Sequence, residues 1–185
     1  KLVWRRLFAR QEMQNLFRSH NVSVIKLRQH INHPSSVSEI RKFEPDILIS
    51  IAGNQLFQQP IIDLAPFGCL NLHTSALPKY RGLMPTFWVL KNNEIKTGVS
   101  VFFVDKGIDS GPIIVQNEII IGNKTQQELI IATKKMGMEA IAKSIEMIQE
   151  NELNIIKNDD LQKTYFSFPN RKDVIEFKNN GKKFF

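Results

Sequence analysis

Residues 68–82 have the sequence GCLNLHTSALPKYRG. The first part alternates polar and apolar side chains, which predicts a strand with Asn71 and His73 on one side and leucines on the other. A strand this apolar has no packing reason to carry an amide and an imidazole side by side. Polar groups at the carboxyl end of a parallel strand lie where α/β folds bind ligands. A ligand site and a structural histidine are equal alternatives at this point.

Strands and helices alternate on both sides of this segment. Residues 47–52 (ILISIA) are continuously apolar, which is typical of a strand buried on both faces of a parallel sheet. Periodicity predicts further strands at residues 22–27, 97–104 and 113–121, and helices at 1–20, 35–43, 60–64, 83–91 and 125–150. The last helix is expected to begin with a capping box formed by Thr125 and Glu128. The helix at 1–20 is expected to pack on a sheet, in preference to a membrane surface. The alternation predicts an α/β fold with a mainly parallel sheet.

The composition fits one globular domain. The chain has 185 residues, of which 42% are hydrophobic, and its single cysteine, Cys69, excludes an internal disulfide framework. A reducing, cytoplasmic location is therefore expected, without a transmembrane segment. His30 and His33 have no cysteine or carboxylate cluster around them, so no metal is expected. The net charge of +7 favours anionic partners, and solvation explains it better than binding to DNA or other nucleic acid.

A second polar segment, DKGIDSGP at residues 105–112, separates two apolar strands. Gly107 and Gly111 tolerate positive φ, so the loop can turn sharply and direct the Asp109 carboxylate. An ordinary glycine-rich turn is the alternative. An amide, an imidazole and a carboxylate would together suit acyl transfer to an amine, which needs a donor to the oxyanion and a route for the amine proton.

The segments GCLNLHTSALPKYRG and VDKGIDSGPII, in this order, resemble the folate-dependent formyltransferases. That family includes methionyl-tRNA, glycinamide ribonucleotide and sugar-amine N-formyltransferases, and the likeness extends from about residue 45 to residue 121. The resemblance implies a three-layer Rossmann-like formyltransferase fold, 10-formyltetrahydrofolate as the formyl donor, and no metal. It also implies that Asn71, His73 and Asp109 are catalytic, with Asn71 and a protonated His73 stabilising the oxyanion.

The same resemblance and the loop after His73 predict the binding residues. The folate site is expected at Ile51, Ala52, Gly53, Ser75, Leu77, Pro78, Gly107 and Ile108. The acceptor is expected at Lys79, Arg81 and Gly82.

The likeness has two departures from the family pattern. The strand and glycine-containing loop that open the family's catalytic domain do not precede residue 22, so this first unit is expected to be absent. Residues 1–150 are predicted to form the catalytic domain and residues 151–185 a basic tail, too short for the tRNA-binding β-barrel of methionyl-tRNA formyltransferases.

The predicted function is transfer of a formyl group to a primary amine. A small phosphorylated amine, such as an amino-sugar nucleotide, is favoured as acceptor, and methionyl-tRNA stays open. A catalytically silent folate- or anion-binding module with the same fold is the alternative from another class. A homodimer also stays open.

Overall fold

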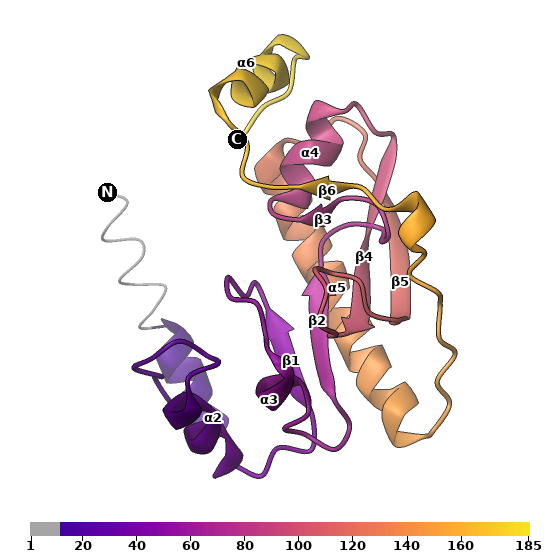
Figure 1. Cartoon of the computed structure of the whole chain (residues 1–185). Coiled ribbons are helices and arrows are strands. Elements are labelled where there is room, and N and C mark those ends of the chain that lie inside the picture. The colour runs from indigo at the N-terminus through magenta and orange to yellow at the C-terminus, as the bar shows by residue number, and fades with distance from the viewer. Residues whose placement is uncertain (1–11) are drawn as a thin grey trace.

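The computed structural model describes residues 12–185 and has an α/β fold, as predicted (Figure 1). Its main sheet contains β1 (Leu48–Ile51), β2 (Cys69–His73), β4 (Lys96–Phe103) and β5 (Ile113–Ile120), in the order β1-β2-β4-β5. The sheet is mixed rather than mainly parallel. β1 and β2 are parallel, whereas β2–β4 and β4–β5 are antiparallel. For the β4–β5 pair the physical reason is the loop between the two strands, because a connection shorter than about a dozen residues joins antiparallel neighbours.

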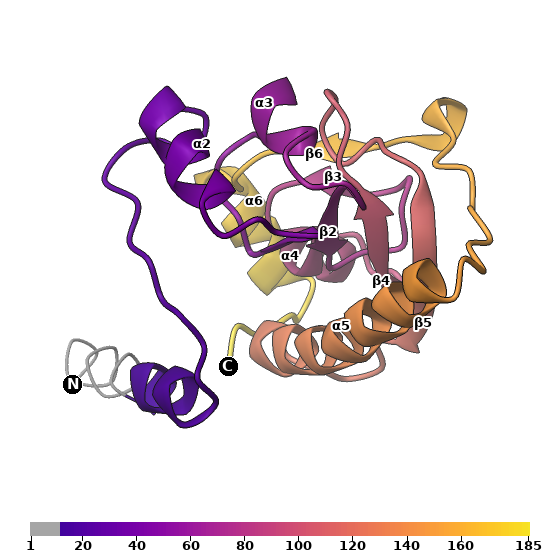
Figure 2. The same ribbon diagram turned by 90° about the horizontal axis from the view of Figure 1, so that it is seen from below.

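Helices cover both faces of this sheet and give three layers. Figure 2 shows α5 (Gln126–Gln149) along one face and α2 (Pro34–Arg41) and α3 (Gln59–Ile62) on the other. The predicted capping box of α5 is confirmed, with Thr125 and Glu128 bonded to each other's backbone N–H. A Cβ atom on Gly137 would lie 2.5 Å from Leu72, so only glycine allows α5 to lie this close beneath β2. None of the helices in residues 12–185 is long and apolar enough to cross a membrane.

The predictions for the start of the chain are wrong in three respects. Residues 22–27 form no strand, and Val24 is 60% exposed. β1 alternates between half-buried and exposed residues, because it is the edge of the sheet among the described strands. Residues 12–19 are helical, but their apolar side chains Met13 and Leu16 are exposed instead of packed on a sheet. Residues 1–11 of the predicted helix lie outside the described residues.

The basic tail is folded onto the rest of the chain. It contains the 3₁₀ turn η1 (Asp160–Gln162), the strand β6 (Tyr165–Phe166) and the helix α6 (Arg171–Asn179). β6 pairs in parallel with β3 (Arg81–Gly82), which directly precedes α4 (Pro85–Lys91). Phe177 of α6 is fully buried and stacks on Phe87 of α4. Residues 151–185 therefore share a hydrophobic core with the residues before them.

Candidate active site

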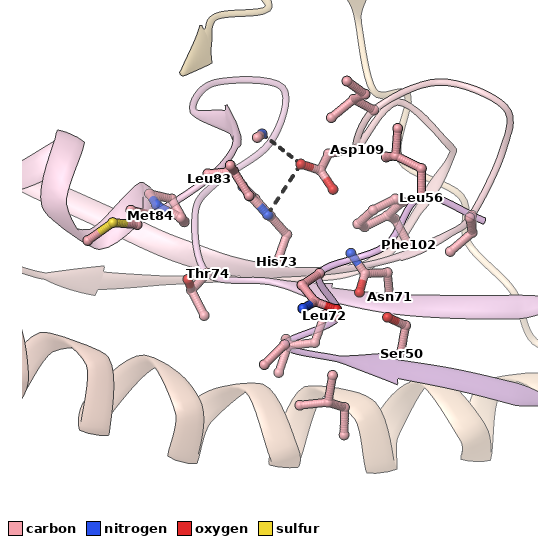
Figure 3. A pocket seen from close by; sticks show the side chains of 18 of the residues that line it. Ser50, Leu56, Asn71, Leu72, His73, Thr74, Leu83, Met84, Phe102 and Asp109 are labelled. Atoms are coloured by element: carbon pink, nitrogen blue, oxygen red, sulfur yellow. Dashed lines mark hydrogen bonds and ion pairs between the residues drawn. The ribbon is translucent and has the colours of Figure 1, made fainter. Parts of the chain in front are cut away.

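A cavity of about 720 Å³ lies where β1 and β2 end (Figure 3). It is lined by the ends of these strands, by the loops at residues 51–57 and 104–109, and by one side of α5. Its volume is in the range of roughly 300–1,000 Å³ that small-molecule sites occupy. The position matches the expectation that ligands bind at the carboxyl ends of parallel strands.

His73 and Asp109 face each other at this cavity, as Figure 3 shows. His73 is 6% exposed, and its Nδ1 lies 3.5 Å from Oδ2 of Asp109. Its Nε2 lies 2.7 Å from the carbonyl oxygen of Tyr80. Each ring nitrogen of His73 therefore lies near an oxygen atom that can accept a hydrogen bond.

Tyr80, whose carbonyl contacts His73, is itself held on three sides. Its ring stacks on Phe166 with centroids 5.3 Å apart, and its hydroxyl donates to Oε1 of Glu94 at 2.6 Å. Burial, assisted by the bond to Glu94, raises the pKa of Tyr80 to about 12. Its backbone N–H donates to Oγ1 of Thr164. The hydrogen-bond partner of His73 is therefore fixed by contacts that the C-terminal residues supply.

Gly82 orients the Asp109 carboxylate. Its backbone N–H donates to Oδ2 of Asp109 at 2.7 Å, the same oxygen that faces His73. Gly82 has φ of +94°, and a Cβ atom there would lie 2.2 Å from the carbonyl oxygen of Phe166. Only glycine fits between Asp109 and β6. Gly82 lines the cavity, where the sequence placed it, but its contact with Asp109 was not predicted.

Asn71 lies beside His73 on the same side of β2, while Leu72 points towards α5 (Figure 3). The predicted alternation of this strand is thus confirmed. The Asn71 side chain is half-buried at the cavity, and it has no hydrogen-bond partner among the described protein groups. Its amide is free to donate to an oxyanion on a bound molecule.

The whole chain was compared with known proteins. Residues 6–145 match the model of the family described as formyl transferase. The chain belongs to this family. It is 34% identical over 148 residues to methionyl-tRNA formyltransferase of Alkaliphilus oremlandii, covering 80% of this chain and 47% of that protein. It is 32% identical over 161 residues to the enzyme of the same name from Geobacter sulfurreducens, covering 86% of this chain and 50% of that protein. The chain thus spans about half the length of the curated relatives that it matches.

Two solved structures share the fold of this chain. The sugar 3N-formyl transferase WlaRD, solved with dTDP and 5-N-formyl-THF, aligns with a TM-score of 0.65 and 26% identity, over 86% of this chain and 53% of that chain. An N-formyltransferase from Helicobacter canadensis, in complex with folinic acid and dTDP-3-aminofucose, aligns with a TM-score of 0.66 and 24% identity, over 91% of this chain and 62% of that chain. The predicted formyltransferase fold is confirmed.

Several residues predicted for binding do line the cavity of this formyltransferase fold. They are Ile51, Ala52, Gly53, Gly107 and Ile108. Ser75, Leu77 and Pro78 are not among the lining residues. Ser75 is fully buried and donates to the carbonyl oxygen of Lys79, and Leu77 packs with Phe102 in the core. These contacts fix the conformation of the loop after His73 without reaching the cavity.

The structure does not bring Lys79 or Arg81 to the cavity. Lys79 is exposed elsewhere. Arg81 is 4% exposed, and its guanidinium donates to Oδ1 of Asn158 and Oδ1 of Asp160, both at 2.7 Å. The sequence places Arg81 near His73 along the chain, but its side chain points to the C-terminal segment instead. The basic side chains that line the cavity in residues 12–185 are Lys106 and Lys134.

The sequence analysis missed the lining residues of α5. Gln126 is 6% exposed at the cavity, and its side-chain amide has no hydrogen-bond partner among residues 12–185. Ile130 and Lys134 follow it at single-turn intervals and line the same space. The helical period of these residues was visible in the sequence, but nothing there showed which side of the helix faces a cavity.

Two further features concern the single cysteine and the residue types that bind metals. Cys69 is 1% exposed, and burial raises its pKa to about 11, so it stays a thiol at neutral pH and is no nucleophile. In the part of the chain that the structure describes, no group of three or more His, Cys, Asp or Glu side chains could hold a metal ion.

Proposed function

We propose that this chain transfers a formyl group from 10-formyltetrahydrofolate to a primary amine. The observation that carries the proposal is the His73–Asp109 pair, which lies beside the free amide of Asn71 at one end of a cavity of substrate size. Membership in the formyl transferase family supports the reaction class. The complex of WlaRD with 5-N-formyl-THF supports a folate as donor.

The cavity suits a flat folate ring. Apolar side chains line it from both loops and from β4, namely Leu56, Phe57, Phe102, Val104 and Ile108. The loop at residues 51–57 adds backbone N–H and C=O groups, which can match the polar edge of a pterin. Ala52 has φ of +55°, so the chain turns sharply as it leaves β1 and its backbone faces the cavity.

The residues around His73 can support a direct transfer. The neutral amine of the acceptor attacks the formyl carbon, where a new C–N bond forms and the bond to N10 of the folate then breaks. Asn71 donates to the oxyanion that develops on the formyl oxygen, and the positive charge of a protonated His73 stabilises it. Asp109 accepts the proton that the amine loses, directly or through water, and the same proton then passes to N10 as the bond from the formyl carbon to N10 breaks.

The acceptor is proposed to be a small phosphorylated amine. Lys106 and Lys134 supply two positive charges at the cavity, which suits one or two phosphates better than an RNA backbone. The exposed aromatic side chains Tyr165 and Phe168 line the same cavity and can stack on a planar base. An amino-sugar nucleotide has both features, and the ligand dTDP-3-aminofucose of the Helicobacter canadensis protein is of this kind.

Methionyl-tRNA is the second candidate acceptor. It is favoured by the names of the curated relatives that share 32–34% of their aligned residues with this chain. The two candidates differ in salt dependence, because each phosphate contact of a tRNA contributes to a steep loss of affinity as salt increases.

An assay with labelled 10-formyltetrahydrofolate tests the proposal. The acceptors would be an amino-sugar nucleotide, glycinamide ribonucleotide and methionyl-tRNA, each over a salt series, with Asp109→Asn as the inactive control. We expect transfer to a small phosphorylated amine with a shallow salt dependence. A steep salt slope together with a preference for methionyl-tRNA would establish the second candidate. Folate binding without transfer to any amine would indicate a silent module.

A further inference from the structure

Asn158 contacts the loop that carries Asp109 from a segment after α5. It is 9% exposed, and its Nδ2 donates to the carbonyl oxygens of Asp109 and Gly111, both at 2.9 Å. An isolated antiparallel bridge between Ile113 and Ile156 brings the segment alongside β5. A single buried amide therefore holds two backbone carbonyl groups of this loop.

The Asp109 loop needs such an anchor. Asp109 has φ of +47°, a left-handed conformation that non-glycine residues seldom adopt. The preceding residues Lys106, Gly107 and Ile108 are exposed. In the observed conformation, the Asp109 carboxylate reaches both the Gly82 N–H and His73 Nδ1. A relaxed backbone at Asp109 would direct the carboxylate elsewhere.

Arg81 determines which way the Asn158 amide faces. Nη2 of Arg81 donates to Oδ1 of Asn158 at 2.7 Å, so Nδ2 of Asn158 is left to face the two carbonyl groups. Arg81 directly precedes Gly82, whose N–H holds the Asp109 side chain. The backbone and the side chain of Asp109 are thus fixed by two neighbouring residues of β3, one acting directly and one through Asn158.

We propose that Asn158 is a positioning residue for formyl transfer: it holds Asp109 in the backbone conformation that presents the carboxylate to His73, and Arg81 orients the Asn158 amide for this purpose. The inference rests on the proposed function. It adds to the site a residue that touches no substrate and lies outside both sequence segments that carry the family resemblance.

Steady-state kinetics of Asn158→Asp test this role, with the exposed Asn154→Ala from the same segment as control. The aspartate has the same shape but cannot donate to the two carbonyl groups. We expect kcat to fall at least about tenfold, with KM for the folate within about twofold. The substitution displaces the Asp109 carboxylate and leaves the side chains proposed to contact the folate unchanged. Asn154→Ala should behave as the unchanged protein.

A double-variant cycle separates positioning from general loss of structure. In an Asp109→Asn background, Asn158→Asp should lower kcat by less than about twofold, because the carboxylate that it positions is already gone. A full and independent second loss would overturn the proposal, as would normal kcat in a folded Asn158→Asp protein. If Asn158→Asp does not fold, Arg81→Lys takes its place, since lysine retains the charge near Asp160 but not the bond to Asn158. Turnover by the unchanged protein in the same assay tests the proposed function separately.

Discussion

The two walls of the cavity are held in opposite ways. On the wall proposed to be catalytic, here the catalytic wall, Asp109 faces His73, its carboxylate accepts from the Gly82 N–H, and its carbonyl oxygen accepts from the buried Asn158. On the wall proposed to bind the folate, here the folate wall, residues 51–56 are exposed, and an asparagine from the N-terminal part contacts the loop. Asn32 donates from Nδ2 to the carbonyl oxygen of Leu56 at 2.7 Å and accepts from the N–H of Gln58 at 2.8 Å.

Under the proposed function, this difference would separate chemistry from binding within one cavity. Groups that move a proton need fixed distances, and burial with many hydrogen bonds provides them. A wall that admits a large flat molecule benefits from few contacts, because regions with little buried area open at low cost. Variants on the two walls should therefore change different kinetic constants.

The largest effect is expected on the catalytic wall. His73→Ala and Asp109→Asn should each lower kcat by at least about a hundredfold, the usual scale for acid–base and oxyanion groups. Thermal unfolding of the variants would confirm that they are folded, and Lys79→Ala, exposed and away from the cavity, is the matched control. Near-normal turnover in either folded variant would remove these residues from the mechanism.

A smaller effect of another kind is expected on the folate wall. Asn32→Ala removes both bonds that hold the loop before α3. KM for 10-formyltetrahydrofolate should rise about fivefold, the scale of one net hydrogen bond, while kcat changes less than about twofold. Steady-state kinetics at saturating acceptor would measure both constants, with the exposed Asn123→Ala as control. A fall in kcat with unchanged KM would contradict the separation of the two walls.

The α5 side of the cavity belongs to neither wall. Gln126→Ala removes a buried amide that faces the cavity without a protein partner among residues 12–185. We expect KM for the acceptor to rise about two- to tenfold, with KM for the folate unchanged. Gln127→Ala is the control, because Gln127 is its exposed neighbour on the same helix. Equal effects of the two variants would mean that Gln126 touches no acceptor.

The smallest expected effect is on the pH dependence of stability, and it concerns Asp160, which pairs with Arg81. The hydrogen bond from Arg81 lowers the pKa of Asp160, so the folded-state pKa is below the unfolded one. The contribution of this carboxylate to stability is therefore complete above its unfolded pKa and is lost as the pH falls through its folded pKa. Asp160 is 65% exposed, so solvent weakens the effect.

Urea unfolding of Asp160→Asn over a pH series would measure the contribution of the Asp160 carboxylate to stability. The unfolding midpoint should lie slightly below that of the unchanged protein at neutral pH, and the difference should vanish in acid. The exposed Glu152→Gln is the control and should show no difference at any pH. A difference that persists in acid would assign the stabilisation to something other than the Arg81–Asp160 pair.

The sequence predicted the elements whose signals are local. The apolar runs of β2, β4 and β5 and the capping box of α5 depend on neighbouring residues, and their structures agree with the predictions. The pairing of His73 with Asp109 could also be anticipated, because two polar segments follow the ends of apolar strands. Residues 22–27 have the composition of a strand, but a strand needs a partner, which composition does not reveal.

The functions of Arg81 and Asn158 could not be predicted for a different reason. Arg81 follows His73 closely and looked available to a phosphate, yet its side chain bonds to residues 77 and 79 positions further along the chain. A contact over such a distance leaves no pattern in a single sequence. The position of Gln126 at the cavity could not be predicted either, because the side of α5 that faces the cavity depends on how the helix packs on the sheet.

The parallel pairing of β3 with β6 has a consequence for how the protein becomes active during synthesis. The ribosome makes His73 and Asp109 long before it makes Tyr165, which pairs with Arg81. Until those later residues leave the ribosome, Arg81 has no Asn158 or Asp160 to bond, and the Asp109 loop lacks its anchor. Contacts between residues so distant along the chain form slowly, because a long loop must close first. On the proposal above, a nascent chain that stops before residue 158 would contain His73 and Asp109 without the contacts that position them.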